Sequence, residues 1–165
     1  MESSEKYIEY VENSISNRNQ IIPLSLYHKA VLNASFLDKE SYGSYYCFNS
    51  TLYEYVQKNK SVKGYEGLVY VDRLILDIDK GALEDYELFE SLKAHIGELL
   101  EFGVKSEDIN IWYSGSGFHV ELLNVFGFQP SKNVHEKVKQ TLNKHFPFAD
   151  SIYDKTRIIR SNWSY

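Results

Sequence analysis

Apolar residues spaced three and four apart predict helices in four parts of the chain. These are Ser4–Ser14, a segment from a cap at Asn49–Thr51 to about Lys60, Leu83–Phe102, and a segment from a Ser131 cap to about His145. The third is the clearest, because its apolar spacing continues over several turns and Gly103 follows as a natural C-cap. The polar segments 13–20 and 60–67 read as connectors.

Extended apolar and aromatic runs predict strands between these helices. The expected strands are Tyr42–Phe48, Leu68–Asp79 with a possible break around Asp72–Arg73, Ile109–Tyr113, Phe118–Leu123, and an extended segment within Ala149–Ile159. The third and fourth are joined by the tight turn Ser114–Gly117, so together they predict a hairpin. This mixture predicts one α+β domain over residues 1–165, since no repeat or long linker divides the chain.

Composition limits the class of protein. The hydrophobic content is 43% and the charged content 25%, which is ordinary for a folded globular chain. No apolar run approaches the roughly 18 residues of a membrane helix, and residues 1–20 are too polar for a signal peptide. We therefore expect no membrane partner and a cytoplasmic location. The single Cys47 excludes an internal disulfide and a cysteine-based zinc site, so it is expected to be a core thiol.

Charge is unevenly distributed along the chain. The net charge of −5 argues against a nucleic-acid partner, but the segment from Ser131 onward is locally basic. Its bases are Lys132, Lys137, Lys139, Lys144, Lys155, Arg157 and Arg160, against the acids Glu136, Asp150 and Asp154. Aromatic residues make up 15% of the chain, and they are suited equally to a core and to stacking on bases.

The run Leu74–Asp79 places two carboxylates at the end of an apolar strand. Because side chains alternate along a strand, Asp77 and Asp79 project to one face while Leu76 and Ile78 point into a core. Two adjacent carboxylates repel each other unless a proton or cation neutralises them, and hard oxygen ligands suit Mg²⁺ or Mn²⁺. Two solvated acids at an exposed strand end are the alternative.

Two further stretches contain residues suited to phosphate binding. The turn Ser114–Gly117 offers backbone N–H groups and hydroxyls, and His119 follows it on the face opposite Phe118. A ligand-free hairpin turn with a structural histidine is the alternative. Arg157 and Arg160 lie three apart and cannot face the same way on an ideal strand, so they either flank a bulge or serve different purposes. A basic edge strand would also explain them.

Taken in order, these stretches resemble a known family. The motifs are Leu74-Ile75-Leu76-Asp77-Ile78-Asp79, then Ser114-Gly115-Ser116-Gly117-Phe118-His119-Val120, then Asp150 followed by Ile152-Tyr153 and Arg157-Ile158-Ile159-Arg160. They resemble the archaeo-eukaryotic primase superfamily, which includes small primase subunits, primase-polymerases and the polymerase domains of bacterial end-joining ligases. The resemblance implies an RRM-like catalytic sheet with flanking helices over residues 68–165, beside an N-terminal α/β portion over residues 1–67.

The resemblance also implies roles for individual residues. Asp77, Asp79 and Asp150 would be the catalytic carboxylates of a two-metal site for Mg²⁺ or Mn²⁺, with Asp154 as a competing third acid. The implied nucleotide-binding residues are Ser114, Ser116, Gly117, His119, Arg157 and Arg160. The implied activity is a metal-dependent, template-directed nucleotidyltransferase, a DNA primase or primase-polymerase that joins NTPs or dNTPs on single-stranded DNA. A gap-filling repair polymerase and a catalytically weak binding module are the alternatives.

The chain departs from this family in several places. Small primase subunits carry an arginine motif where this chain has Tyr45–Phe48, and Lys29, His28 or Lys39 would have to substitute for it. Many relatives have a basic residue where this chain has Gly115-Ser116. No zinc module is present, so an accessory domain, a large primase subunit or a helicase is an expected partner. The end at 162–165, soon after the last expected strand, is compatible with a catalytic core cut from a longer protein.

Overall fold

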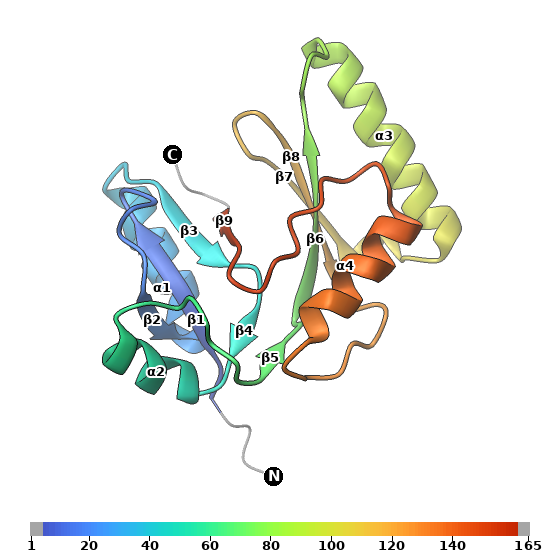
Figure 1. Ribbon diagram of the computed structural model, residues 1–165. Coiled ribbons are helices and arrows are strands. Elements are labelled where there is room, and N and C mark those ends of the chain that lie inside the picture. The colour runs from blue at the N-terminus through green and yellow to red at the C-terminus, as the bar shows by residue number, and fades with distance from the viewer. Residues whose placement is uncertain (1–4, 162–165) are drawn as a thin grey trace.

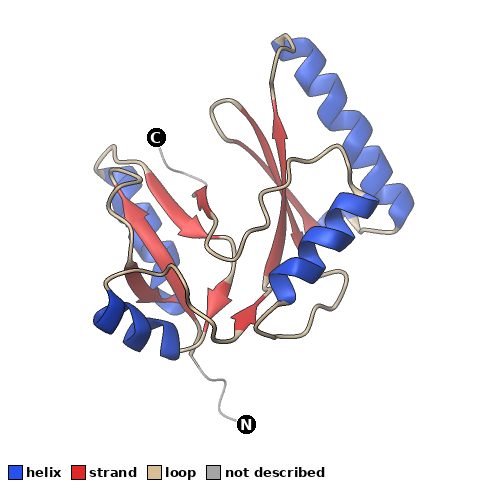
Figure 2. Cartoon of the chain, in the orientation of Figure 1, coloured by secondary structure: helices blue, strands red, loops and turns tan. Residues whose placement is uncertain are grey.

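The computed structural model of the chain describes residues 5–161 and arranges them around two antiparallel β-sheets (Figure 1). Helices α1 (Leu24–Phe36) and α2 (Thr51–Asn59) lie beside the first sheet. Helices α3 (Asp85–Phe102) and α4 (Val134–His145) lie against the second sheet, on its side away from the first. Figure 2 shows the helices and strands of the chain in the same orientation. The combination of helices with antiparallel sheets confirms the α+β class.

The first sheet has six strands in the order β5-β4-β1-β3-β9, and β2 also pairs with β1. Their bounds are β1 Tyr7–Glu12, β2 Gln20–Pro23, β3 Ser41–Ser44, β4 Cys47–Phe48, β5 Val69–Tyr70 and β9 Ile158–Arg160. Strand β9 pairs with β3 and β5 pairs with β4, although both lie within the segment 68–165 that the resemblance assigns to the second portion. The two ends of that segment therefore join the first sheet.

The second sheet has the order β6-β8-β7, with β6 at Arg73–Asp79, β7 at Ile109–Tyr113 and β8 at Gly117–Leu123. A short 3₁₀ helix, Ser106–Asp108, precedes β7. The register sets Asp77 opposite His119 and Asp79 opposite Gly117. The end of β6 thereby lies directly beside the hairpin turn.

The hydrophobic core spans both sheets. Leu76 and Ile78 are buried, as the alternation along β6 predicts. On the other face of this strand, Ile75 is fully buried, and its backbone N–H donates to the Tyr45 hydroxyl at 2.8 Å. Tyr46 is also buried and donates to the Tyr153 carbonyl at 2.9 Å. These tyrosines are therefore core residues. Cys47 is buried as expected, and between residues 5 and 161 no helix is both long and apolar enough to cross a membrane.

Several sequence predictions are confirmed. The strand expected over Leu68–Asp79 breaks where predicted, between β5 and β6. Strand β7 has its predicted bounds, β8 follows after the tight turn, and Gly103 is the left-handed C-cap of α3. Helix α2 and the end of α4 at His145 also agree with the apolar spacing.

The predicted helix Ser4–Ser14 is wrong. Ser4 lies outside the described residues, and Tyr7–Glu12 forms β1, which pairs with β2, β3 and β4. The residues from Ile8 to Val11 are all buried, so the strand has no polar face from which a period of two could be read. Tertiary pairing thus overrides the weak helical spacing of this segment.

Other boundaries also differ from the sequence predictions. Helix α1 follows Pro23 and was not predicted. Only Val31 and Ala34 are buried in it, and its other apolar side chains are partly buried or exposed, so the helix has no strong apolar face. The run Tyr42–Phe48 forms two short strands rather than one. Ser131 is not the cap of α4, which begins after Asn133, because Ser131 pairs with Val69 through backbone hydrogen bonds. The last strand is limited to three residues.

Candidate metal centre

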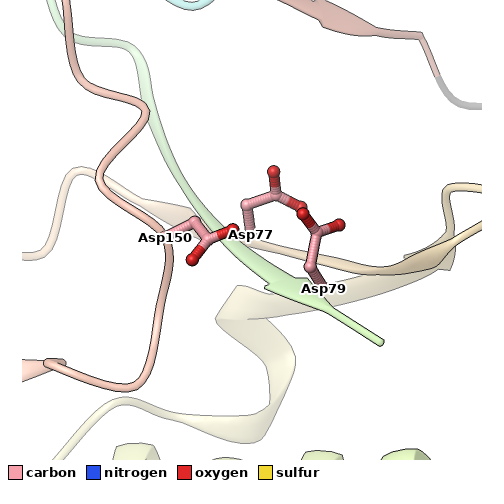
Figure 3. A group of neighbouring side chains, drawn as sticks. All are labelled: Asp77, Asp79 and Asp150. Carbon is pink, nitrogen blue, oxygen red and sulfur yellow. The ribbon is translucent and has the colours of Figure 1, made fainter. Parts of the chain in front are cut away.

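The end of β6 brings the two predicted carboxylates together. Asp77 and Asp79 project to the same face, and ligand oxygens of these two residues and of Asp150 all lie within 4.8 Å of one another (Figure 3). Asp77 is partly buried, whereas Asp79 and Asp150 are exposed. Three hard oxygen donors at this spacing form a cluster that could hold a divalent cation.

A backbone interaction places Asp150 beside the pair. One edge of β6 pairs with β8, and on its other edge the Asp150 N–H donates to the Asp77 carbonyl at 2.9 Å. This isolated antiparallel bridge sets Asp150 next to Asp77, although 73 positions separate them in the sequence. The segment that carries Asp150 runs between the two sheets, from α4 to β9 (Figure 1).

The competing acid Asp154 lies elsewhere. Its side chain is exposed and its carboxylate is 3.5 Å from the Lys139 Nζ atom. It does not belong to the cluster formed by Asp77, Asp79 and Asp150. The structure therefore favours Asp150 as the third carboxylate.

The electrostatics of the cluster fit a cation. Partial burial raises the pKa of Asp79, and the neighbouring carboxylates of Asp77 and Asp150 raise it further. The buried Oδ1 atom of Asp77 accepts no hydrogen bond from any residue between 5 and 161. A divalent ion would satisfy this oxygen and remove the mutual repulsion, which is a physical reason to expect one here.

His119 lies beside the acids on the face that alternation predicts. Its Nε2 atom is 3.3 Å from Asp77 Oδ1, without the alignment of a hydrogen bond. Its ring meets the Trp112 ring edge to face, with centroids 5.5 Å apart. His119 is only 5% exposed, a burial that the sequence pattern did not indicate. Its position next to a carboxylate suits either a proton-donating or a structural role.

Gly117 permits the close approach of the hairpin to β6. A Cβ atom at this position would lie 2.2 Å from the Ile78 carbonyl oxygen, so no larger residue fits without a backbone shift. The turn is closed by the Ser114 N–H, which donates to the Gly117 carbonyl at 2.8 Å. The packing thus gives Gly117 a structural role, and its predicted contact with a nucleotide remains a prediction.

A cavity of about 520 Å³ lies against this cluster and takes its walls from both sheets. The second sheet and its hairpin contribute Asp77, Asp79, Ser114, Ser116 and His119. The first sheet and the segment before β9 contribute Ile15, Arg18, Tyr42, Ile152, Asp154, Thr156, Arg157, Ile158, Ile159 and Arg160. Two of the three predicted acids, Asp77 and Asp79, therefore share one cavity with the predicted phosphate-binding residues other than Gly117, whereas Asp150 is not among the lining residues. The size of the cavity is typical of sites for small organic ligands.

The arginines of the cavity differ in their partners. Arg160 donates to Glu40 at 2.9 Å and lies over the Tyr42 ring, whose centroid is 5.8 Å away. Arg157 is exposed and makes no ion pair with any residue between 5 and 161. Arg157 is therefore the better placed of the two to receive an anion.

Sequence reasoning missed Arg18 and Ile15, both in the loop between β1 and β2. No motif marks them, because the loop reads only as a polar connector. The three substitutes considered for the missing arginine motif do not line the cavity, and Lys39 instead pairs with Glu12 at 2.7 Å. Arg18 is the cation that the loop between β1 and β2 brings to the cavity.

Comparisons of the chain with protein-family models, with curated proteins and with solved structures find no match. The candidate site therefore rests on its own geometry and on the sequence motifs.

Proposed function

We propose that the protein is a metal-dependent, template-directed nucleotidyltransferase, a DNA primase or primase-polymerase of the archaeo-eukaryotic primase kind. The observation that carries this proposal is the convergence of Asp150 on Asp77 and Asp79. The latter two acids line the cavity that Ser114, His119 and the basic residues also line. A carboxylate cluster facing donors for phosphate is the arrangement that nucleotidyl transfer requires.

The order of elements in the second sheet supports the proposal. The sequence β6-α3-β7-β8-α4 follows the first five elements of a β-α-β-β-α-β motif, as the expected RRM-like sheet does. The sixth element of the motif, its fourth strand, would pair with the free edge of β6. Here the bridge between Asp77 and Asp150 occupies that edge, and β9 joins the first sheet instead. The third carboxylate thus stands where the motif would place its last strand.

In the proposed mechanism, Asp77, Asp79 and Asp150 would hold Mg²⁺ or Mn²⁺, which supplies charge stabilisation and lowers the pKa of the attacking hydroxyl. The primer 3′-hydroxyl would lose its proton to solvent, its oxygen would form a bond to the α-phosphorus of the nucleotide, and the bond from this phosphorus to the pyrophosphate oxygen would break. Ser114 and Ser116 hold the triphosphate through their hydroxyls, and Arg157 balances its charge. His119 donates to a phosphate oxygen from beside Asp77.

A primer-extension assay tests the proposal. The protein is incubated with single-stranded template, Mn²⁺ and labelled nucleotides, with and without a primer, beside a D77A/D79A variant. Metal-dependent product without primer identifies a primase, and product only with primer identifies a gap-filling or extending polymerase. Product from the wild type that vanishes in the double variant supports the proposal. Absence of metal-dependent product under all conditions would overturn it.

One observation favours a second candidate, a catalytically weak nucleotide- or nucleic-acid-binding module for replication initiation. The guanidinium groups of Arg18 and Arg160 are paired with Glu9 and Glu40, so much of the positive charge near the cavity is already neutralised. This candidate predicts nucleotide binding without incorporation. An accessory domain, a large primase subunit or a helicase would then be the partner that uses the bound nucleotide.

A further inference from the structure

The loop between β1 and β2 is held in a defined conformation at the rim of the cavity. Asn13 and Asn19 at its ends adopt left-handed backbone angles, with φ of 70° and 74°. Asn17 donates through its side chain to the Glu12 carbonyl at 3.0 Å. The Asn19 side chain accepts from the Val62 N–H at 2.9 Å. The loop is thus tied to the surrounding structure along its length.

Arg18 fixes this loop to the segment that carries Arg157. Its Nε and Nη2 atoms donate to the Glu9 carboxylate at 3.1 and 2.6 Å, and Nη2 also donates to the Thr156 carbonyl at 2.7 Å. The Glu9 side chain is 2% exposed, so the acid of this pair is buried, while Arg18 is partly exposed. The position of the loop relative to the cavity is therefore set by specific contacts.

Ile15 is the apolar residue that this loop presents to the cavity. It is 60% exposed, yet it lines the cavity together with Tyr42 and Arg18. The rest of the loop, from Asn13 to Asn19, consists of Asn, Ser and Arg. Ile15 does not belong to the hydrophobic core or to the partly buried residues packed against it, and the loop is anchored by hydrogen bonds and the ion pair between Arg18 and Glu9.

A nucleoside triphosphate has two chemically different ends. The acids and hydroxyls of the second sheet suit the metal-bound triphosphate, whereas the base and sugar require apolar or stacking contacts. On the wall contributed by the first sheet, Ile15 and Tyr42 offer such surface. We propose that Ile15 contacts the base or sugar of the bound nucleotide, an inference that rests on the proposed function. Because an aliphatic side chain reads no hydrogen-bonding pattern, this contact is independent of the base.

Paired binding measurements test this inference. Affinities of the full chain for dATP and for inorganic tripolyphosphate are measured by calorimetry in the presence of Mn²⁺, for the wild type, I15A and the control L26A. Leu26 is 52% exposed on α1 and does not line the cavity. We expect I15A to weaken dATP binding about 5- to 20-fold, as the loss of apolar contact predicts, and to leave tripolyphosphate binding within about twofold. L26A should change neither affinity.

The outcomes separate this inference from the function on which it rests. If the wild type binds both ligands and I15A changes neither affinity, or weakens both equally, the role of Ile15 is refuted while the proposed function stands. If the wild type binds neither ligand with Mn²⁺, both proposals are overturned. Ile15 is exposed, so I15A should keep the melting temperature of the wild type.

Discussion

At the scale of single residues, the site is defined by an unfavourable arrangement of charge. Asp79 lies beside Asp77 and Asp150, and burial and these carboxylates raise its pKa. A carboxyl group with a raised pKa favours the folded state while it is protonated, and this contribution is lost as the pH rises through its folded pKa. A bound cation reverses the effect, because metal ligation needs the ionised carboxylate.

Thermal unfolding of D79N tests this reversal. Without metal at neutral pH, the variant should melt at a temperature equal to or above that of the wild type, because one repelling charge is removed. Mn²⁺ should stabilise the wild type, increasingly as the pH rises from about 4 to about 7, and should not stabilise D79N. A wild-type melting temperature that does not respond to Mn²⁺ at any pH in this range would contradict the metal site.

A second prediction at this scale concerns Gly117. A Cβ there meets the Ile78 carbonyl at 2.2 Å, so G117A should cost about 1–3 kcal/mol in the free energy of unfolding. Gly97 in α3 has open space around its Cβ position, so the control G97A should stabilise the protein by about 0.5–1 kcal/mol. Chemical denaturation of both variants measures the difference. Equal effects of the two substitutions would show that the close approach is not required.

At the scale of elements, the sequence predicts the helices and strands that have a clear local pattern of apolar residues. It does not predict the features that depend on pairing between distant segments. Strands β6, β7 and β8 and helix α3 follow from their periodicity, and the shared face of Asp77 and Asp79 follows from the strand period of two. Strand β1 was misread because it is buried on both faces. The place of Asp150 is fixed by a long-range backbone bridge, so only the family resemblance pointed to it. No local sequence motif marks Arg18 as a residue of the cavity.

The loop anchor gives a prediction at the scale of elements. R18A leaves the Glu9 carboxylate buried without its cation, and we expect a loss of about 2–3 kcal/mol in the free energy of unfolding, less than for a fully buried pair because Arg18 is partly exposed. K39A breaks the more exposed pair with Glu12 and serves as the control, with an expected loss below about 1 kcal/mol. Urea denaturation compares them, and similar losses would contradict a structural anchor in the loop.

At the scale of the whole molecule, the cavity joins two sheets that contribute different chemistry. Asp77, Asp79, the serine hydroxyls and His119 come with the second sheet and its hairpin, and the basic residues come with the first sheet and the segment before β9. A metal-bound triphosphate would contact both walls. Binding should therefore depend on residues from each side.

Substitution of Arg157 tests whether binding depends on the wall of the cavity that carries the basic residues. R157A should weaken the Mn²⁺-dependent binding of dATP about 10-fold or more, because a charge-assisted contact to phosphate is lost. K144A removes an exposed charge from α4, away from the cavity, and should have little effect. Calorimetric titrations measure both affinities. Equal weakening by the two substitutions would indicate a general effect of net charge.

The most direct test of the proposed two-metal catalyst compares D150N with D154N in Mn²⁺-dependent nucleotide incorporation on a primed single-stranded template. Both acids are exposed and lie four residues apart, but only Asp150 joins Asp77 and Asp79. We predict that D150N reduces the incorporation rate at least about 100-fold, whereas D154N stays within about threefold of the wild type. Activity that survives in D150N, or is lost equally in D154N, would contradict the proposed site.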